Sequence, residues 1–259
     1  MTKEKLHKEP KTKEKDQAPI IEIKDLHKTF GKDNKVLKGV NLTLNKGEDL
    51  VVLGRSGSGK SVTIKCIVGL IEPDKGEIKV FDENVLNISK KELNEIRVRI
   101  GFLFQSGALY DSMSVRENLS FTLTKHKRDL SAEEIESEVM EALESVGLSE
   151  AIDKMPSELS GGMKKRIGLA RTLILKPEII LYDEPTTGLD TITSREISEL
   201  ILDIKHKQKT SSIIITHDMA CAKLTADRII VLKEGVIHAE GTYEELEKNE
   251  DEWVRSFFE

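Results

Sequence analysis

Several features are scarce in this chain of 259 residues, and each absence excludes a class of protein. The two cysteines, Cys66 and Cys221, lack the spacing of a metal site or a disulfide framework, so we interpret both as reduced thiols that pack in the core. No apolar run approaches the roughly 20 residues that span a bilayer, and the N-terminus lacks the hydrophobic segment of a secretory signal. We therefore expect the protein to reach a membrane only by docking on something already there.

Basic charge and aromatic side chains are also scarce. The formal net charge is −6 and aromatic residues make up 4% of the chain, so there is no basic field of the kind that wraps nucleic acid. Residues 1–17 contain six lysines and four acidic residues and almost nothing apolar. We predict a disordered charged tail there. An alternative role for the tail, contact with anionic lipid headgroups, is weakened by the interspersed acidic residues.

The chain is organised around one glycine-rich stretch, Gly54-Arg55-Ser56-Gly57-Ser58-Gly59-Lys60-Ser61. It follows an apolar run at 50–53 and precedes an apolar helical pattern, so the order is strand, tight loop, helix. Glycines let backbone N–H groups face a phosphate, and the helix N-terminus adds a positive dipole end. Lys60 is expected to reach the β- and γ-phosphates, and the Ser61 hydroxyl to hold Mg²⁺. The stretch predicts triphosphate binding; the alternative is a glycine-rich turn that matches the pattern by accident.

Strand and helix patterns alternate around this loop. Two half-buried strands, with Phe30 and Gly31 in the loop between them, and four further strands are predicted at residues 20–26, 36–44, 77–81, 100–104, 179–182 and 212–216. The pattern turns helical after Gln105. We therefore predict one α/β domain over residues 18–245, with a mostly parallel sheet and a helical lobe inserted at about 106–172. Ligands of such a sheet bind at the carboxyl ends of its strands.

Polar residues follow three of the predicted strands. Asp183 is the carboxylate that a P-loop enzyme needs to hold Mg²⁺ opposite Ser61. Glu184 comes next, and a second carboxylate can orient or deprotonate an attacking water; alternatively the pair only caps the following turn. Gln105 and His217 end two other strands. A lone Gln or His is more often a satisfied polar group, yet both fall where a γ-phosphate would lie.

A second phosphate-binding cap is predicted at Ser160, Gly161 and Gly162, where a helix over residues 164–175 begins. One nucleotide needs only one such cap. Two caps in one chain suggest a composite site, in which one copy supplies the loop at Lys60 and another supplies Ser160 to Gly162.

These motifs together resemble a known family. With GRSGSGKS, Gln105, LSGGM, IILYDEP, TGLD and His217 in this order, residues 20–241 closely resemble the ATP-binding subunit of ABC transporters. The resemblance implies a RecA-like P-loop ATPase core with an antiparallel β lobe. It also implies a head-to-tail dimer that closes over two ATP molecules and drives transmembrane permease subunits. Met163 departs from the pattern, because many relatives have Gln there, and this puts only the flanking contacts of the cap in doubt.

The same resemblance assigns roles to individual residues. Phe30 would stack on the adenine, and the loop from Gly54 through Val62 would hold the phosphates of ATP. Glu184 would be the catalytic base, with Lys60 and His217 at the γ-phosphate. Mg²⁺ would be held by Ser61, Gln105 and Asp183. Asp190 would lie at the dimer seam, and Gln105 would also report to the membrane partner.

A narrower resemblance concerns the transported substrate. Residues 104–115 (FQSGALYDSMSV), residues 155–158 (MPSE) and the sequence GKSV look like the ATPase of mammalian-cell-entry (Mla-type) phospholipid transporters. Such complexes pair two ATPases with two permease subunits and a lipid-binding subunit. The alternative is that residues 104–115 are ordinary packing between lobes. By this resemblance we expect a cytoplasmic protein, peripheral on the inner face of the cell membrane.

The end of the chain carries an aromatic cluster in a charged tail at residues 246–259. Trp253, Phe257 and Phe258 are expected to pack on the core of the chain or on the partner ATPase.

Three rival functions remain open. A simple P-loop kinase would not need the cap at Ser160. A soluble ABC ATPase acting on nucleic acid predicts either a long coiled coil in the insert or a basic groove, and the 54 residues between Gln105 and Ser160 leave no room for the coiled coil. A scaffold that binds nucleotide without hydrolysis is disfavoured by the presence of Glu184 and His217.

Overall fold

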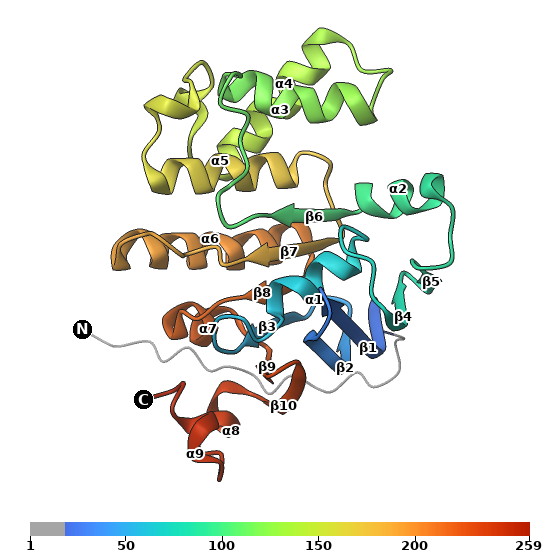
Figure 1. Cartoon of the computed structure of the whole chain (residues 1–259). Coiled ribbons are helices and arrows are strands. Elements are labelled where there is room, and N and C mark those ends of the chain that lie inside the picture. The colour runs from blue at the N-terminus through green and yellow to red at the C-terminus, as the bar shows by residue number, and fades with distance from the viewer. Residues whose placement is uncertain (1–18) are drawn as a thin grey trace, which may run out of the picture.

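The computed structural model describes residues 19–259, so the predicted disordered tail at 1–17 lies outside the described part of the chain. Among these residues the strands form two sheets (Figure 1). The larger sheet has the order β10 (Val236–Gly241), β9 (Arg228–Lys233), β3 (Asp49–Leu53), β8 (Ser211–Ile215), β7 (Ile179–Asp183), β6 (Ile100–Leu103). All its pairings are parallel except that of β10 with β9. The predicted mostly parallel sheet is confirmed.

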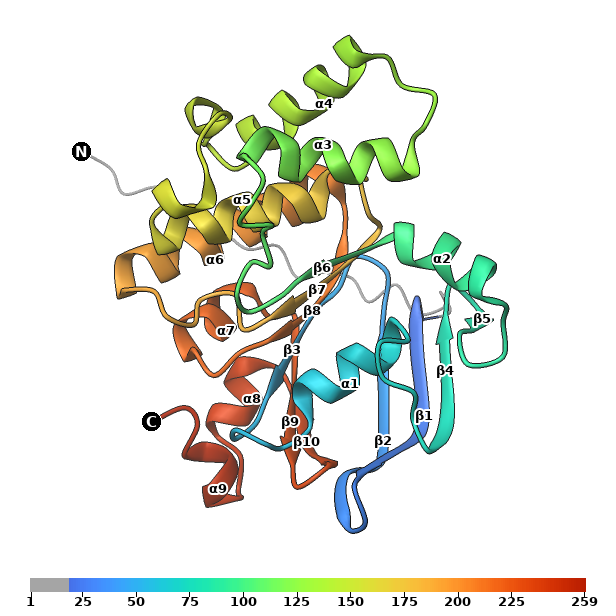
Figure 2. The same ribbon diagram turned by 45° about the horizontal axis from the view of Figure 1, so that its top comes forward.

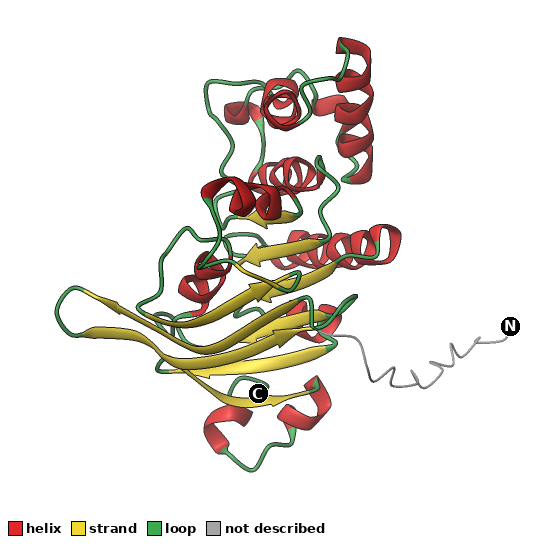
Figure 3. Ribbon diagram, turned by 90° about the vertical axis from the view of Figure 1, so that its right-hand side faces the viewer, coloured by secondary structure: helices red, strands yellow, loops and turns green. Residues whose placement is uncertain are grey.

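The smaller sheet is antiparallel and has the order β2 (Asn34–Leu44), β1 (Ile21–Phe30), β4 (Lys75–Val80), β5 (Glu83–Asn84). Its long strands form the hairpin that projects from the molecule in Figure 3. The prediction that Phe30 lies in the hairpin loop is wrong. Phe30 is the last residue of β1 and pairs with Asn34, because the ladder continues until only residues 31–33 remain to make the turn.

Helices cover both faces of the parallel sheet. Side chains of its strands alternate between two cores, as the period of a strand requires: Val51 and Tyr182 face one core, and Leu50 and Leu181 face the other. The first core is closed by α6 (Thr191–Gln208), α7 (Met219–Thr225) and the helical lobe. The second is closed by α1 (Lys60–Ile67), α2 (Lys90–Val98) and the antiparallel sheet (Figure 2).

The helical lobe stands at the top of Figure 1 and comprises α3 (Val115–His126), α4 (Ala132–Ser145) and α5 (Gly161–Leu173), with short 3₁₀ turns at Ser149–Ala151 and Pro156–Glu158. Capping boxes at Ser89 and Ser131 start α2 and α4. A third, at Ser114, starts α3, a helix that the sequence pattern did not separate from its neighbours. The chain ends in α8 (Tyr243–Glu247) and α9 (Glu252–Arg255), which lie beside β9 and β10.

Candidate functional site

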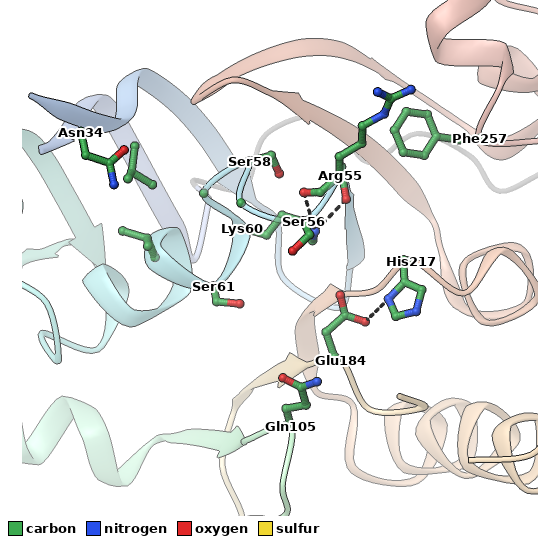
Figure 4. A pocket seen from close by; sticks show the side chains of 15 residues that line it. Asn34, Arg55, Ser56, Ser58, Lys60, Ser61, Gln105, Glu184, His217 and Phe257 are labelled. Atoms are coloured by element: carbon green, nitrogen blue, oxygen red, sulfur yellow. Dashed lines mark hydrogen bonds and ion pairs between the residues drawn. The ribbon is translucent and has the colours of Figure 1, made fainter. Parts of the chain in front are cut away.

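A pocket of about 970 Å³ lies where the glycine loop meets the carboxyl ends of the parallel strands. Its volume is at the upper end of the range of small-molecule sites. Figure 4 shows side chains from segments far apart in the sequence converging on it. The lining comprises Asn34, Val36, all residues from Gly54 through Val62, Gln105, Glu184, His217 and Phe257.

The glycine loop is shaped by close backbone approach. Gly54 has φ +155°, and a Cβ atom there would lie 2.4 Å from the Leu232 carbonyl oxygen. Gly59 precedes α1 with φ +107°, in the left-handed region that favours glycine. α1 is also the one described α-helix that begins without a side-chain cap; the eight others are each capped by Ser, Thr or Asp. Its first N–H groups are thus left available for an anion.

Lys60 is buried inside the loop that it follows. Its Nζ donates to the carbonyl oxygens of Gly54, at 2.7 Å, and of Arg55, at 3.3 Å. Burial lowers the pKa of this lysine, and the nearby carboxylates of Glu184 and Asp183 oppose that shift. The ammonium therefore lies under the cradle, where it can exchange a backbone contact for a phosphate oxygen.

Ser58 supplies an independent sign that the cradle is built for a ligand. Its Oγ is buried and is one of two buried side-chain atoms, among the described residues, that have no hydrogen-bond partner. Unpartnered buried polar atoms are costly. A phosphate oxygen in the loop would accept the hydrogen bond that this hydroxyl lacks.

The two predicted magnesium ligands Ser61 and Asp183 are brought together from α1 and β7. Ser61 Oγ donates to Asp183 Oδ1 at 2.7 Å, although 122 positions separate them in the sequence. Within residues 19–259 no group of three or more His, Cys, Asp or Glu is placed to hold a metal by itself. A hydroxyl and one carboxylate nonetheless fit Mg²⁺, which takes oxygen ligands and completes its shell with water and substrate phosphates.

Glu184 is the centre of a hydrogen-bonded group. Its Oε2 accepts a hydrogen bond from the Thr187 hydroxyl at 3.0 Å. It also accepts one from His217 Nδ1 at 2.7 Å (Figure 4). Because a carboxylate can only accept, Nδ1 carries the proton and Nε2 remains as the free ring nitrogen. Glu184 also has φ +54°, a left-handed conformation uncommon for a residue with a side chain. Such backbone strain is concentrated at functional sites.

Six sequence-predicted residues do not line the pocket of their own chain, and of these Asp183 reaches it only through its bond to Ser61. Phe30 is 40% exposed, and Lys28 Nζ lies 5.5 Å from the centre of its ring. Ser160 caps α5 by accepting a hydrogen bond from Met163 N, and Gly161 and Gly162 form the first turn of that helix. Asp190 caps α6 and accepts hydrogen bonds from the backbone of Ile192 and Thr193. Their roles stay predictions.

Three lining residues were not predicted. Asn34 and Val36 belong to β2, and nothing in their sequence context marks them. Phe257 comes from the tail, where its aromatic character was noted but its position beside the loop was not. In the structure Trp253, Phe257 and Phe258 pack against the first core, and Arg55 of the glycine loop lies 6.0 Å from the centre of the Trp253 ring.

The two cysteines are buried and have a structural role. Burial raises the pKa of Cys66 and of Cys221 to about 11, so both thiols stay protonated and inert at neutral pH. Within residues 19–259, no helix combines the length and the apolar composition needed to cross a bilayer.

Comparison with known proteins agrees with this geometry. The model of the ABC transporter family matches residues 37–187. A probable ribonucleotide transport ATP-binding protein of Mycobacterium leprae is 41% identical over 92% of this chain and 68% of its own length. The protein trigalactosyldiacylglycerol 3, chloroplastic, of Arabidopsis thaliana is 39% identical over 94% of this chain and 74% of its own.

A solved structure has the same fold. It is a dimeric ATP-binding cassette in a post-hydrolysis state with ADP and phosphate bound, and it superposes with a TM-score of 0.78. The match covers 86% of this chain and 98% of that one at 33% identity. With an ATP-sized pocket built on the glycine loop and matches of this extent, the chain belongs to the ABC transporter family, as its ATP-binding and ATP-hydrolysing subunit.

Proposed function

We propose that two copies of this chain close over two ATP molecules and power a membrane transporter for phospholipids or another hydrophobic substrate. The observation that carries the substrate class is the 39% identity, over 94% of this chain, to the Arabidopsis protein named for a galactolipid. The phospholipid-transporter pattern in residues 104–115 supports the same class.

Hydrolysis in this proposal is carried by side chains at three strand ends. Glu184 is the base that orients and deprotonates the attacking water, and the Thr187 hydroxyl and His217 fix the direction of its carboxylate. The free Nε2 of His217 would contact the γ-phosphate when ATP is bound. Ser61, Asp183 and Gln105 would hold Mg²⁺, which neutralises charge on the phosphates when it is bound.

The dimer completes the site. Ser160, Gly161 and Gly162 lie at the N-terminus of α5, outside the pocket of their own chain, and would serve the ATP held by another copy. Asp190 would lie at the same seam. The dimeric state of the solved relative supports this arrangement. Binding of ATP would close the dimer and release of phosphate would reopen it.

The permease contact is proposed at the segment after Gln105. Tyr110 and Phe121 are 48% and 40% exposed, and their rings pack edge to face at 5.5 Å. Exposed aromatic side chains of this kind are typical of interface anchors. The protein would then work on the cytoplasmic face of the cell membrane, with a lipid-binding subunit in the same complex.

Two alternatives remain as outcomes of a test. The Mycobacterium relative is named for ribonucleotide transport, which favours an ABC transporter of another substrate. A soluble ABC ATPase acting on nucleic acid is the second, and the net charge of −6 disfavours it.

Affinity purification decides among them. A tagged Glu184→Gln variant, trapped with ATP and Mg²⁺ in its native membranes, is purified and the accompanying proteins and lipids are identified. A multispanning permease with a lipid-binding subunit and bound phospholipid is the expected result. A permease with a solute-binding protein would discard the lipid substrate, and recovery of nucleic acid without any membrane protein would discard the transporter.

A further inference from the structure

Lys165 is a buried lysine that the roles described so far do not use. It lies in the second turn of α5 and is 6% exposed. Burial lowers the pKa of this lysine, and the carboxylates of Glu184 and Asp183 oppose the shift. It forms no ion pair with another described residue within 4 Å, so its ammonium is held by hydrogen bonds alone. A buried charge is costly, so the presence of a lysine at this position calls for a specific role.

The partners of Lys165 are two main-chain carbonyls. Its Nζ donates to the Gln105 carbonyl oxygen and to the Glu184 carbonyl oxygen, the latter at 3.2 Å. Gln105 follows β6 and Glu184 follows β7, and these strands are parallel neighbours. The side chains of both residues line the nucleotide pocket. One ammonium thus joins the two points of backbone from which these side chains project.

Other residues of α5 contact the segment that follows Gln105. Gly168 packs against Gly107 so closely that a Cβ atom at Gly168 would lie 3.0 Å from the Gly107 Cα. Arg171 donates to the Ala108 carbonyl oxygen at 2.7 Å. Lys165, Gly168 and Arg171 are spaced by three residues and share one helical face. This face of α5 therefore fixes residues 105–108 along two helical turns.

The backbone of Glu184 needs such support. Its left-handed φ of +54° is held from two sides, by its N–H donating to the Ile215 carbonyl at 2.9 Å and by Lys165 at its carbonyl. A strained conformation persists only where its surroundings fix it. Loss of either bond would let the peptide relax and move the carboxylate relative to His217.

We propose that Lys165 is a positioning residue for ATP hydrolysis, which sets the orientation of Glu184 and Gln105 by bonding both of their carbonyl groups from the helix that begins at Ser160. It links the helical lobe to the hydrolytic carboxylate. Movement of α5 against the sheet would change the geometry of Glu184 directly.

The test is the steady-state kinetics of the full chain with Lys165→Met, which keeps the unbranched stem of the side chain and removes its donors. We expect kcat to fall about tenfold or more while the KM for ATP stays within about twofold, because the phosphate cradle is untouched. Lys164→Met is the matched control. Lys164 is the preceding residue of the same helix, half-buried, and its side chain makes no hydrogen bond or ion pair with another described residue.

A combination with His217→Ala separates positioning from general weakening of the fold. If Lys165 acts through Glu184, the double variant should be within about threefold of His217→Ala alone, because the two changes disturb the same carboxylate. Multiplication of the two separate losses would overturn the proposal, as would a kcat within twofold of the wild type. Should Lys165→Met not fold, the same kinetics are measured with Lys165→Gln. The amide of this variant has too short a reach to bond both carbonyl groups, so kcat should again fall, and a kcat within twofold of the wild type would overturn the proposal.

Discussion

The imidazole Nδ1 of His217 lies 2.7 Å from Oε2 of Glu184, although 33 positions separate the two residues in the sequence. β7 and β8 are adjacent and parallel, so the residues that follow them meet at one edge of the sheet. The pair leaves one oxygen of the carboxylate and one nitrogen of the ring free to face the pocket. This arrangement suits a base that must be aimed at a water molecule beside a phosphate.

Removal of the imidazole tests that arrangement. His217→Ala should lower kcat about 100-fold, within the range of losses found when proton-transfer groups are misplaced. The KM for ATP should change little, because the loop at Lys60 still holds the phosphates. His238→Ala is the control: that histidine bonds Asp251 at 2.6 Å and does not line the pocket. Equal losses in both variants would contradict the role of His217.

The bond between Ser61 Oγ and Asp183 Oδ1 predicts a shift in metal dependence. Ser61→Ala removes one proposed Mg²⁺ ligand and leaves the carboxylate in place. The Mg²⁺ concentration for half-maximal ATP hydrolysis should rise about tenfold or more, since one hard oxygen ligand is lost. Titration of activity with MgCl₂ at saturating ATP measures it. An unchanged Mg²⁺ titration would show that Ser61 does not hold the metal.

Phe257 predicts that the tail affects ATP binding. Phe257→Ala should raise the KM for ATP a few-fold, because the ring forms part of the pocket wall. Phe258→Ala is the matched control, since that ring packs on Tyr243 at 5.0 Å instead. The two variants should lose similar stability, measured by thermal melting, and differ in KM. The same KM in both would place Phe257 outside the binding surface.

The cysteines give a prediction about pH. Raising a thiol pKa from 9.0 to about 11 cuts the reactive thiolate at pH 8 about 100-fold. Cys66 and Cys221 should therefore resist iodoacetamide at pH 8 in the folded protein and react in denaturant, as mass spectrometry would show. Reactivity should rise as the pH approaches 11. Fast alkylation of the native chain at pH 8 would mean that the thiols are accessible.

The sequence predicted those parts of the molecule that local chemistry determines. The glycine loop and the strand runs can each be recognised from neighbouring residues, and each is found in the structure. The meeting of Ser61 with Asp183 followed from the rule that ligands gather at the carboxyl ends of parallel strands.

Contacts between distant segments were not predictable in this way. The backbone bonds of Lys165, the position of Phe257 and the inclusion of Asn34 in the pocket depend on how lobes pack, and no local pattern encodes them. Phe30 was misplaced for a related reason. The length of the hairpin is set by pairing across the ladder, which continues to Asn34, and the Gly31 signal marks only where the turn begins.

The central claim is that Glu184 performs hydrolysis in a site that binds ATP without it. The most direct measurement follows phosphate release and bound nucleotide together, in the full chain and in Glu184→Gln, with ATP and Mg²⁺ present. The account predicts that the variant retains ATP with at least the affinity of the wild type and releases phosphate at least 100-fold more slowly. Phosphate release at the wild-type rate, with ATP bound equally well, would contradict it.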